Sequence, residues 1–146
     1  MGTYDIVYKS KPYSQANVID DHIQSAKDAF LSNDFETMET LWARQAPVSC
    51  IHPGWHHLKG RDLVMESWRG ILSNSEGTPF QLRNATANVH GDMAVVICYE
   101  VFQEASLVAT NVFVREDGHW RVMHHQSGGS PPPPPGEEPE TPETIQ

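Results

Sequence analysis

The hydrophobic pattern of this chain changes its period once, near residue 79, and that change limits the folds that the chain can adopt. Before this point, apolar side chains recur every three or four residues, as on one face of a helix. After it, they alternate with polar side chains, as along a strand. Helices followed by a series of long strands indicate an α+β fold, with the helices packed on one face of an antiparallel sheet.

The pattern also gives approximate bounds for the elements. Helices are expected over 18–31, over a shorter stretch whose apolar face runs from Phe35 to Trp42, and over 61–72. A short strand is expected at 48–51, and four longer strands over 80–89, 93–103, 107–115 and 120–127.

Short local motifs mark the boundaries between these elements. Asn33, with Glu36 three residues later, resembles a capping box for the second helix. The pairs Gly91-Asp92 and Asp117-Gly118 are the residue types that tight hairpin turns require.

The length of the strands predicts a curved sheet. Strands of about ten residues are longer than a small flat sheet needs, and a sheet of this size generally coils. Three helices over its concave side would leave a cavity at one end. We therefore expect a cone-shaped, curved antiparallel sheet covered by three N-terminal helices.

Composition separates a folded body from a tail. From residue 130 the sequence reads SPPPPPGEEPETPETIQ, which holds seven of the eleven prolines and no lysine or arginine. Such a segment buries too little apolar surface to offset the entropy lost on ordering, which predicts disorder. We therefore divide the chain into an N-terminal extension (1–15), one folded domain (16–129) and a disordered tail (130–146). The five consecutive prolines could also bind a proline-recognising module, although a passive tail is the favoured interpretation.

Charge and hydropathy exclude several classes of function. The formal net charge is −9, and no basic stripe of the kind that binds nucleic acid is present. No apolar run approaches transmembrane length, and the N-terminus lacks the apolar core of a signal peptide. We therefore expect no nucleic-acid or membrane partner and a cytoplasmic location. Cys50 and Cys98 both lie in apolar runs and are expected to be small buried hydrophobic residues, with a disulfide left open.

Three segments resemble a known family: SCIHPGWHHLKGRDLVMESWRGIL, ATNVFVREDGHWRVMHHQS and AFLSNDFETMETLW. They are similar to the SnoaL-like branch of the superfamily named after nuclear transport factor 2, over approximately residues 16–128. The resemblance implies a cystatin-like cone with an internal pocket, often homodimeric through its sheet. Relatives include polyketide cyclases, a steroid isomerase, dehydratases and proteins with no known reaction. The chain lacks an Asp base matched with a Tyr donor, which argues against steroid chemistry.

Two histidines are the candidate catalytic groups. His52 follows the first short strand directly before Pro53-Gly54, so its imidazole could point into the cone. Strict alternation along the last strand puts Trp120, Val122, His124 and Gln126 on the concave face. We therefore expect His124 and Gln126 in the pocket, and Arg121 and His125 at solvent or in a dimer contact. A neutral imidazole is a natural general base. The competing interpretation is that these histidines are structural or surface residues.

Five further side chains are expected to line the pocket. Asn111 is an amide among β-branched neighbours, and it either orients a ligand or bridges to the backbone. Glu100 is the single carboxylate of the most apolar strand, so burial would raise its pKa, whereas exposure at the strand edge is the alternative. The aromatic candidates are Trp42, Trp55 and Trp68, each of which could equally be a core residue.

No metal or cofactor is predicted. His52 and His56 have helical ligand spacing, but Pro53-Gly54 prevents the helix that would make the spacing useful. A site formed by His52, His56 and His124 remains the alternative. The sequence has no HExxH, CxxC, GxSxG, P-loop or GxGxxG motif.

These observations favour a small-molecule-binding protein. The leading hypothesis is a cofactor-independent isomerase, cyclase or dehydratase that works by histidine-assisted proton transfer in the cone pocket. The alternative is a non-catalytic ligand-binding or dimeric scaffold module.

Overall fold

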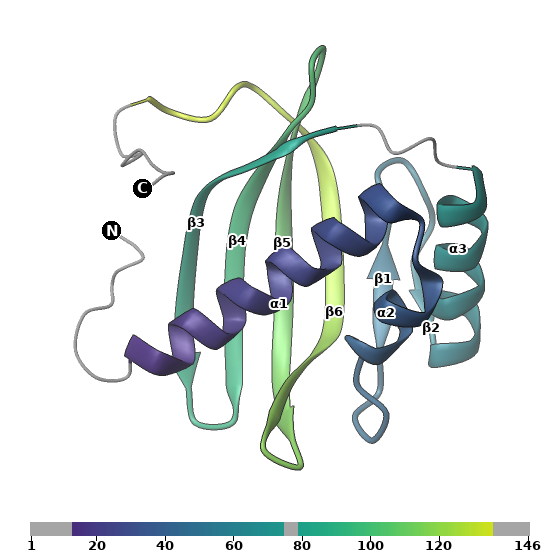
Figure 1. Cartoon of the computed structure of the whole chain (residues 1–146), viewed down its shortest axis with the longest axis vertical. Helices are drawn as coiled ribbons and strands as arrows, with labels where there is room; N and C mark the ends of the chain where they lie inside the picture. The colour runs from purple at the N-terminus through teal and green to yellow at the C-terminus, as the bar shows by residue number, and fades with distance from the viewer. Residues whose placement is uncertain (1–12, 75–78, 136–146) are drawn as a thin grey trace.

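The computed structural model describes residues 13–74 and 79–135, with side chains described from residue 18 onward. Figure 1 shows the arrangement of the elements. The helices are α1 (Tyr13–Ser32), α2 (Phe35–Thr40) and α3 (Arg61–Asn74). The strands are β1 (Ser49–Ile51), β2 (Leu58–Lys59), β3 (Gln81–His90), β4 (Met93–Val101), β5 (Ser106–Glu116) and β6 (His119–Ser130).

The six strands form one curved sheet in the order β2-β1-β6-β5-β4-β3. Helix α1 crosses one face of this sheet, and α2 and α3 lie beside β1 and β2 at its end (Figure 1). The predicted α+β architecture is therefore confirmed. The sheet is not wholly antiparallel, however, because β1 pairs with β6 in parallel. Strand β2 was not predicted, since two residues are too short to show an alternating pattern.

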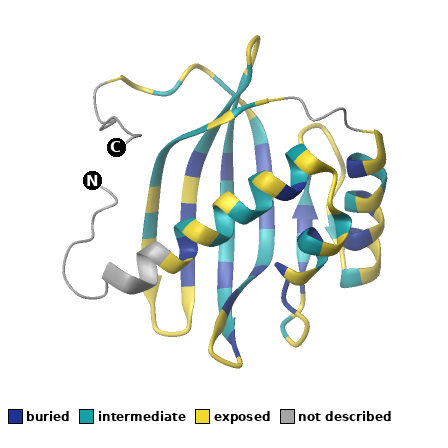
Figure 2. Cartoon of the chain, in the orientation of Figure 1, coloured by how far each residue is buried: buried dark blue, intermediate teal, exposed yellow. Residues whose placement is uncertain are grey.

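The hydrophobic core lies between α1 and the concave face of the sheet. Ile19 on α1, Val96 on β4 and Phe113 on β5 are each almost completely buried. Figure 2 shows buried positions recurring along β4 and β6, as expected for strands with one face against the core. Among the described residues, no helix is both long and apolar enough to cross a membrane.

The start of α2 differs from the predicted capping box. Asn33 has a positive φ of 60°, so it forms the turn that follows α1. Asp34 is the N-cap, because its Oδ1 accepts a hydrogen bond of 3.2 Å from the backbone N–H of Thr37. The Asp117-Gly118 hairpin is as expected, with both residues at positive φ.

A β-bulge in β6 overturns the predicted orientation of the residues that follow it. Phe113 pairs with Val122 but Val112 pairs with His124, so Met123 is an extra residue without a partner across the ladder. One inserted residue reverses which side chains face the core. Val122 faces inward as predicted, but beyond the bulge His125 and Ser127 take the inward positions. The prediction that His124 and Gln126 face the cavity is therefore wrong.

Two charged side chains clamp the segment between α2 and β1. The Glu116 carboxylate accepts hydrogen bonds of 2.7–3.0 Å from the backbone N–H groups of residues 44–46. The Arg61 guanidinium donates to the carbonyls of Glu39, Trp42 and Ala43 at 2.8–3.2 Å. The two side chains thereby satisfy backbone groups at the end of α2 and in the segment that follows it.

The C-terminal boundary also differs from the prediction. Gly128 and Gly129, which follow the predicted end of the last strand at residue 127, lie within β6 and pair with β5. Beyond β6, the Asn84 side chain donates a 3.2 Å hydrogen bond to the carbonyl of Pro134. The predicted disordered tail falls outside the described residues from 136 onward, as does most of the predicted N-terminal extension.

Candidate functional site

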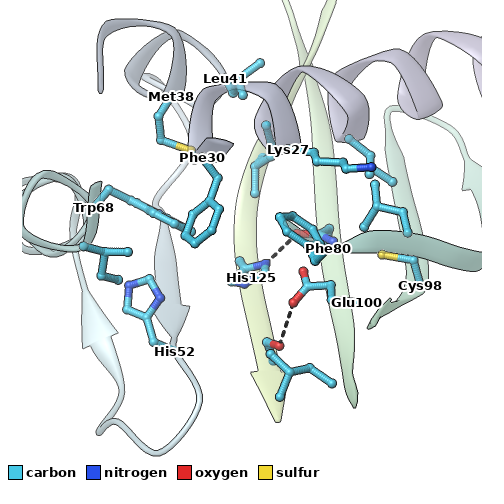
Figure 3. Close-up of a pocket in the computed structure, with 18 of the residues that line it drawn as sticks. Lys27, Phe30, Met38, Leu41, His52, Trp68, Phe80, Cys98, Glu100 and His125 are labelled. Atoms are coloured by element: carbon cyan, nitrogen blue, oxygen red, sulfur yellow. Dashed lines mark hydrogen bonds between the residues drawn. The ribbon is translucent and has the colours of Figure 1, made fainter. Parts of the chain in front are cut away.

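A cavity of about 300 Å³ opens between α1, α3, the loop after β1 and the concave face of the sheet. Most of its lining is apolar and aromatic, and a few polar groups converge on it (Figure 3), which is the usual constitution of a small-molecule site. The polar and charged side chains that line it are His22, Lys27, His52, Glu100, Asn111, His125 and Ser127.

His125 is held by Asn111, its cross-strand partner on β5. The Nδ1 of His125 lies 2.7 Å from the Oδ1 of Asn111. An amide oxygen only accepts hydrogen bonds, so Nδ1 carries the proton and Nε2 keeps its lone pair. Burial, followed by the proximity of His52 and His124, lowers the pKa of His125 to about 3. His125 is therefore a neutral imidazole at pH 7, with Nε2 as its proton acceptor.

Glu100 projects into the same cavity from β4 (Figure 3). Burial raises the pKa of its carboxyl group, and a 3.3 Å hydrogen bond from the Ser127 hydroxyl lowers it to a smaller extent. A carboxyl group with a raised pKa retains its proton to higher pH, so it is suited to act as an acid. The expectation that Glu100 faces the cavity agrees with its position.

His52 is fixed by a short chain of hydrogen bonds in α3. The Ser67 hydroxyl donates to the Val64 carbonyl at 2.7 Å, so it accepts from the Nε2 of His52 at 2.8 Å. The tautomer is thus set with the proton on Nε2 and the lone pair on Nδ1. Burial lowers the pKa of His52 to about 4, so this imidazole is neutral at pH 7 as well.

Aromatic rings surround His52. Trp55 and Trp68 contact it edge-on, with ring centroids at 4.7 and 4.8 Å. The centroid of the His125 ring lies 6.4 Å from that of His52, so the two neutral imidazoles share one region of the cavity. Trp55 is 47% exposed, which places it at the edge of the pocket rather than in the core.

Neither cysteine is a candidate nucleophile. Both are free and buried. Burial raises the pKa of the Cys50 thiol to about 12, and burial likewise raises that of Cys98, so the reactive thiolate is not formed at neutral pH.

The structure brings together most of the predicted site residues. His52, Trp42, Trp55, Trp68, Glu100 and Asn111 all line the cavity. His124 and Gln126 do not line it, because the bulge turns them to the opposite face of the sheet. There, the His124 Nδ1 lies 2.6 Å from the Ser49 hydroxyl of the neighbouring strand.

Four polar lining residues were missed by sequence reasoning: His22, Lys27, His125 and Ser127. His125 and Ser127 were assigned to the outer face, and the adjacent pair His124-His125 was the available signal that one imidazole must face inward. Lys27 was not considered, since it lies between the apolar positions Ala26 and Phe30 of α1, where a lysine usually extends into solvent.

The alternative histidine metal site is not assembled. His56 is exposed, and His124 lies on the outer face of the sheet. No group of three or more His, Cys, Asp or Glu side chains within the described ranges could hold a metal ion.

Comparison with known families gives a match over most of the chain. Residues 19–132 match the family described as the SnoaL-like domain. The chain belongs to the SnoaL-like family. The matched region of this SnoaL-like protein includes every polar side chain that lines the cavity.

Individual relatives agree with this membership. A "putative dehydratase from the NTF2-like family" of Streptomyces avermitilis has 31% sequence identity and a TM-score of 0.76, covering 82% of this chain and 99% of that one. An uncharacterized protein of cystatin-like fold from Caulobacter vibrioides has 18% identity and a TM-score of 0.69, covering 82% and 92% of the two chains, and shows the fold alone.

One curated relative is a longer protein. The F-box protein SKIP8 of Arabidopsis thaliana is 30% identical over 92 residues. These residues make up 62% of this SnoaL-like chain and 40% of the plant protein, so the similarity covers less than half of that relative.

Proposed function

We propose that this SnoaL-like protein binds a small carbonyl compound in its cavity and catalyses the loss of water from it by proton transfer. The observation that carries the proposal is the pair of groups that face one apolar cavity with opposite pKa shifts: a neutral His125 and a Glu100 carboxyl group whose pKa is raised by burial. Groups shifted apart in this way suit an acid and a base. The similarity to the Streptomyces avermitilis protein favours dehydration among the proton-transfer reactions.

The proposed step moves two protons. The Nε2 of His125 takes the proton from the carbon next to the carbonyl, a double bond forms to the neighbouring carbon, and the C–O bond there breaks. Glu100 gives its proton to the departing hydroxyl, which leaves as water. Because one group becomes positive as the other becomes negative, the buried pocket gains no net charge, and this limits the desolvation cost.

Asn111 would support this step in two ways. Its Oδ1 accepts from His125 and fixes the tautomer that leaves Nε2 unprotonated. Its Nδ2 has no partner among the described residues and can donate to the substrate oxygen on which negative charge develops. His52, held by Ser67, would form part of the wall that positions the substrate.

The test compares two adjacent histidines. A panel of β-hydroxy ketones and β-hydroxy acids is screened for the ultraviolet absorbance of the unsaturated product. We expect His125→Asn and Glu100→Gln each to lower turnover about a hundredfold or more, because each removes a proton-transfer group. His124→Asn should leave turnover within about twofold. Turnover that survives in His125→Asn, or no product with any compound of the panel, would overturn the proposal.

A second candidate is a non-catalytic binding module, as the sequence already allowed. It is favoured by the F-box relative, in which the matched 92 residues are only part of a longer chain. A module predicts ligand binding without any conversion of the ligand. Mass spectrometry of compounds recovered after incubation with the protein separates the two candidates, because the enzyme returns a product 18 Da lighter.

We also propose a homodimer that forms through the outer face of the sheet. Alternation places Val95, Ile97 and Val112 on this face, and Ile97 is 39% exposed. Burying such a face against a second copy would remove apolar surface from water. Ile97→Glu should convert the dimer to a monomer in sedimentation velocity, whereas Leu63→Glu on α3 should not. A monomeric wild-type protein would refute the dimer.

A further inference from the structure

Lys27 is the one lysine or arginine among the described residues that line the cavity. It extends from α1 over Phe80 (Figure 3), with its Nζ 5.7 Å from the centre of that ring. No described carboxylate forms an ion pair with it, although acidic residues outnumber basic ones by nineteen to ten in the chain. A half-buried lysine that lines a pocket and has no described carboxylate partner is available to an anionic ligand.

The other described titratable side chains of the cavity do not form an ion pair with Lys27. His52 and His125 are neutral at pH 7, and burial lowers the pKa of His22. Glu100, the single acidic side chain of the lining, has a raised pKa and so carries less negative charge than an exposed carboxylate. The described lining therefore holds one lysine and one carboxyl group whose ionised form is disfavoured by burial.

The walls near Lys27 are aromatic. Phe80 stacks on Phe102 with centroids 5.1 Å apart, and it meets Phe30 edge-on at 5.6 Å. All three rings line the cavity, whose volume of about 300 Å³ is at the lower end for small-molecule sites. Such walls accept a flat or compact apolar body, and a single ammonium group accepts one carboxylate.

We propose that the natural ligand is a small organic acid with an aromatic or alicyclic body, whose carboxylate pairs with Lys27. This inference rests on the proposed function in that the cavity is taken to be the binding site. The inference restricts the substrate of that site to carbonyl compounds that carry a carboxylate. Such a substrate would be held between Lys27 and the polar groups of the sheet.

The experiment uses two ligands of the same shape and different charge. The dissociation constants of 2-naphthoate and 2-naphthamide are measured by calorimetry for the full chain. We expect the acid to bind about tenfold more tightly than the amide, because a charge-assisted hydrogen bond in a partly buried site is stronger than an ion pair in full contact with water. Lys27→Met should abolish this preference without changing the affinity for the amide, and Lys27→Arg should keep it. Lys59→Met, an exposed lysine on β2, is the matched control and should behave as wild type.

The outcomes separate the two proposals. Equal binding of acid and amide by the wild-type protein, or a preference that survives in Lys27→Met, overturns the anionic ligand and leaves the pocket proposal standing. Failure of both ligands to bind overturns the inference together with the proposed binding site. A preference for the acid that weakens as ionic strength rises supports an ion pair at the mouth of the cavity.

Discussion

Lowering the pH from 6.5 to about 4.5 should reduce the free energy of unfolding by roughly 4 kcal/mol, since each buried imidazole contributes about 1.4 kcal/mol per pH unit. His125 and His52 have folded-state pKa values of about 3 and 4, below the ordinary 6.5. Between those values and 6.5 the unfolded chain binds more protons than the folded one. Stability is therefore complete above pH 6.5 and is lost as the pH falls.

Other groups modify this slope in known directions. Burial lowers the pKa of His22 and of His124, so both add to the loss of stability in acid. Glu100 acts in the opposite sense, because its raised pKa makes the folded state bind more protons above pH 4.5, and its contribution falls as the pH rises. The predicted net change is smaller than the sum of the histidine contributions for this reason.

Urea unfolding at a series of pH values measures the effect. His125→Gln keeps a donor for Asn111 but cannot titrate, so the slope between pH 6.5 and 4.5 should fall by about one third or more. His90→Gln, whose side chain is exposed at the end of β3, is the control and should keep the wild-type slope. The slope is independent of any constant loss of stability in the variant. An unchanged slope in His125→Gln would show that His125 does not titrate as described.

Glu116→Ala should lower the free energy of unfolding by about 3 kcal/mol. The carboxylate accepts three backbone hydrogen bonds, and a hydrogen bond to a charged group makes a net contribution of about 1.5–3 kcal/mol. Part of the sum is recovered in the variant, because Arg44 and Gln45 are exposed and water can bind their N–H groups. Burial alone would raise the pKa of Glu116. The three hydrogen bonds lower this pKa by more than burial raises it, so the carboxylate is ionised at neutral pH. Its contribution is present above the ordinary pKa and is lost as the pH falls below it.

The same substitution should also loosen the packing of the cavity lining. The clamped segment carries Leu41 and Trp42, which are buried and line the cavity. Glu116→Gln puts an amide NH₂ against a backbone N–H, so it should lose most of the same stability. Asp117→Asn, the exposed neighbour, is the control and should change stability by less than about 0.5 kcal/mol. Thermal and urea unfolding measure the stability of all three variants. A Glu116→Ala protein as stable as Asp117→Asn would show that the Glu116 hydrogen bonds do not stabilise the segment after α2.

Local pattern was sufficient to predict the elements of this fold. The period of three to four predicted α1, α2 and α3, and the alternation predicted β3 to β6 within a few residues of their bounds. Burial of one face imposes these periods on the sequence itself. The helix cap was displaced by one residue, because Asn33 adopts the positive φ that ends α1 and leaves the cap to Asp34.

The sequence also predicted three of the polar residues that line the pocket. Asn111 and Glu100 are polar residues in apolar strands, and His52 follows a strand at a Pro-Gly break, so each is unusual at its own position. Lys27 is not unusual on an amphipathic helix. Its importance depends on Phe80 and on the absence of a described carboxylate partner, which are properties of its surroundings.

The sequence by itself determined the order and type of the elements, the α+β class, and the kinds of side chain that could form a site. Tertiary structure alone decided which of two adjacent histidines enters the cavity. Alternation along β6 is a local rule, but the extra residue at Met123 exists only relative to the pairing with β5. The sequence of β6 alone does not show which of its residues lacks a partner on β5. The change from His124 to His125 as the inward residue is therefore seen only when the two strands are paired.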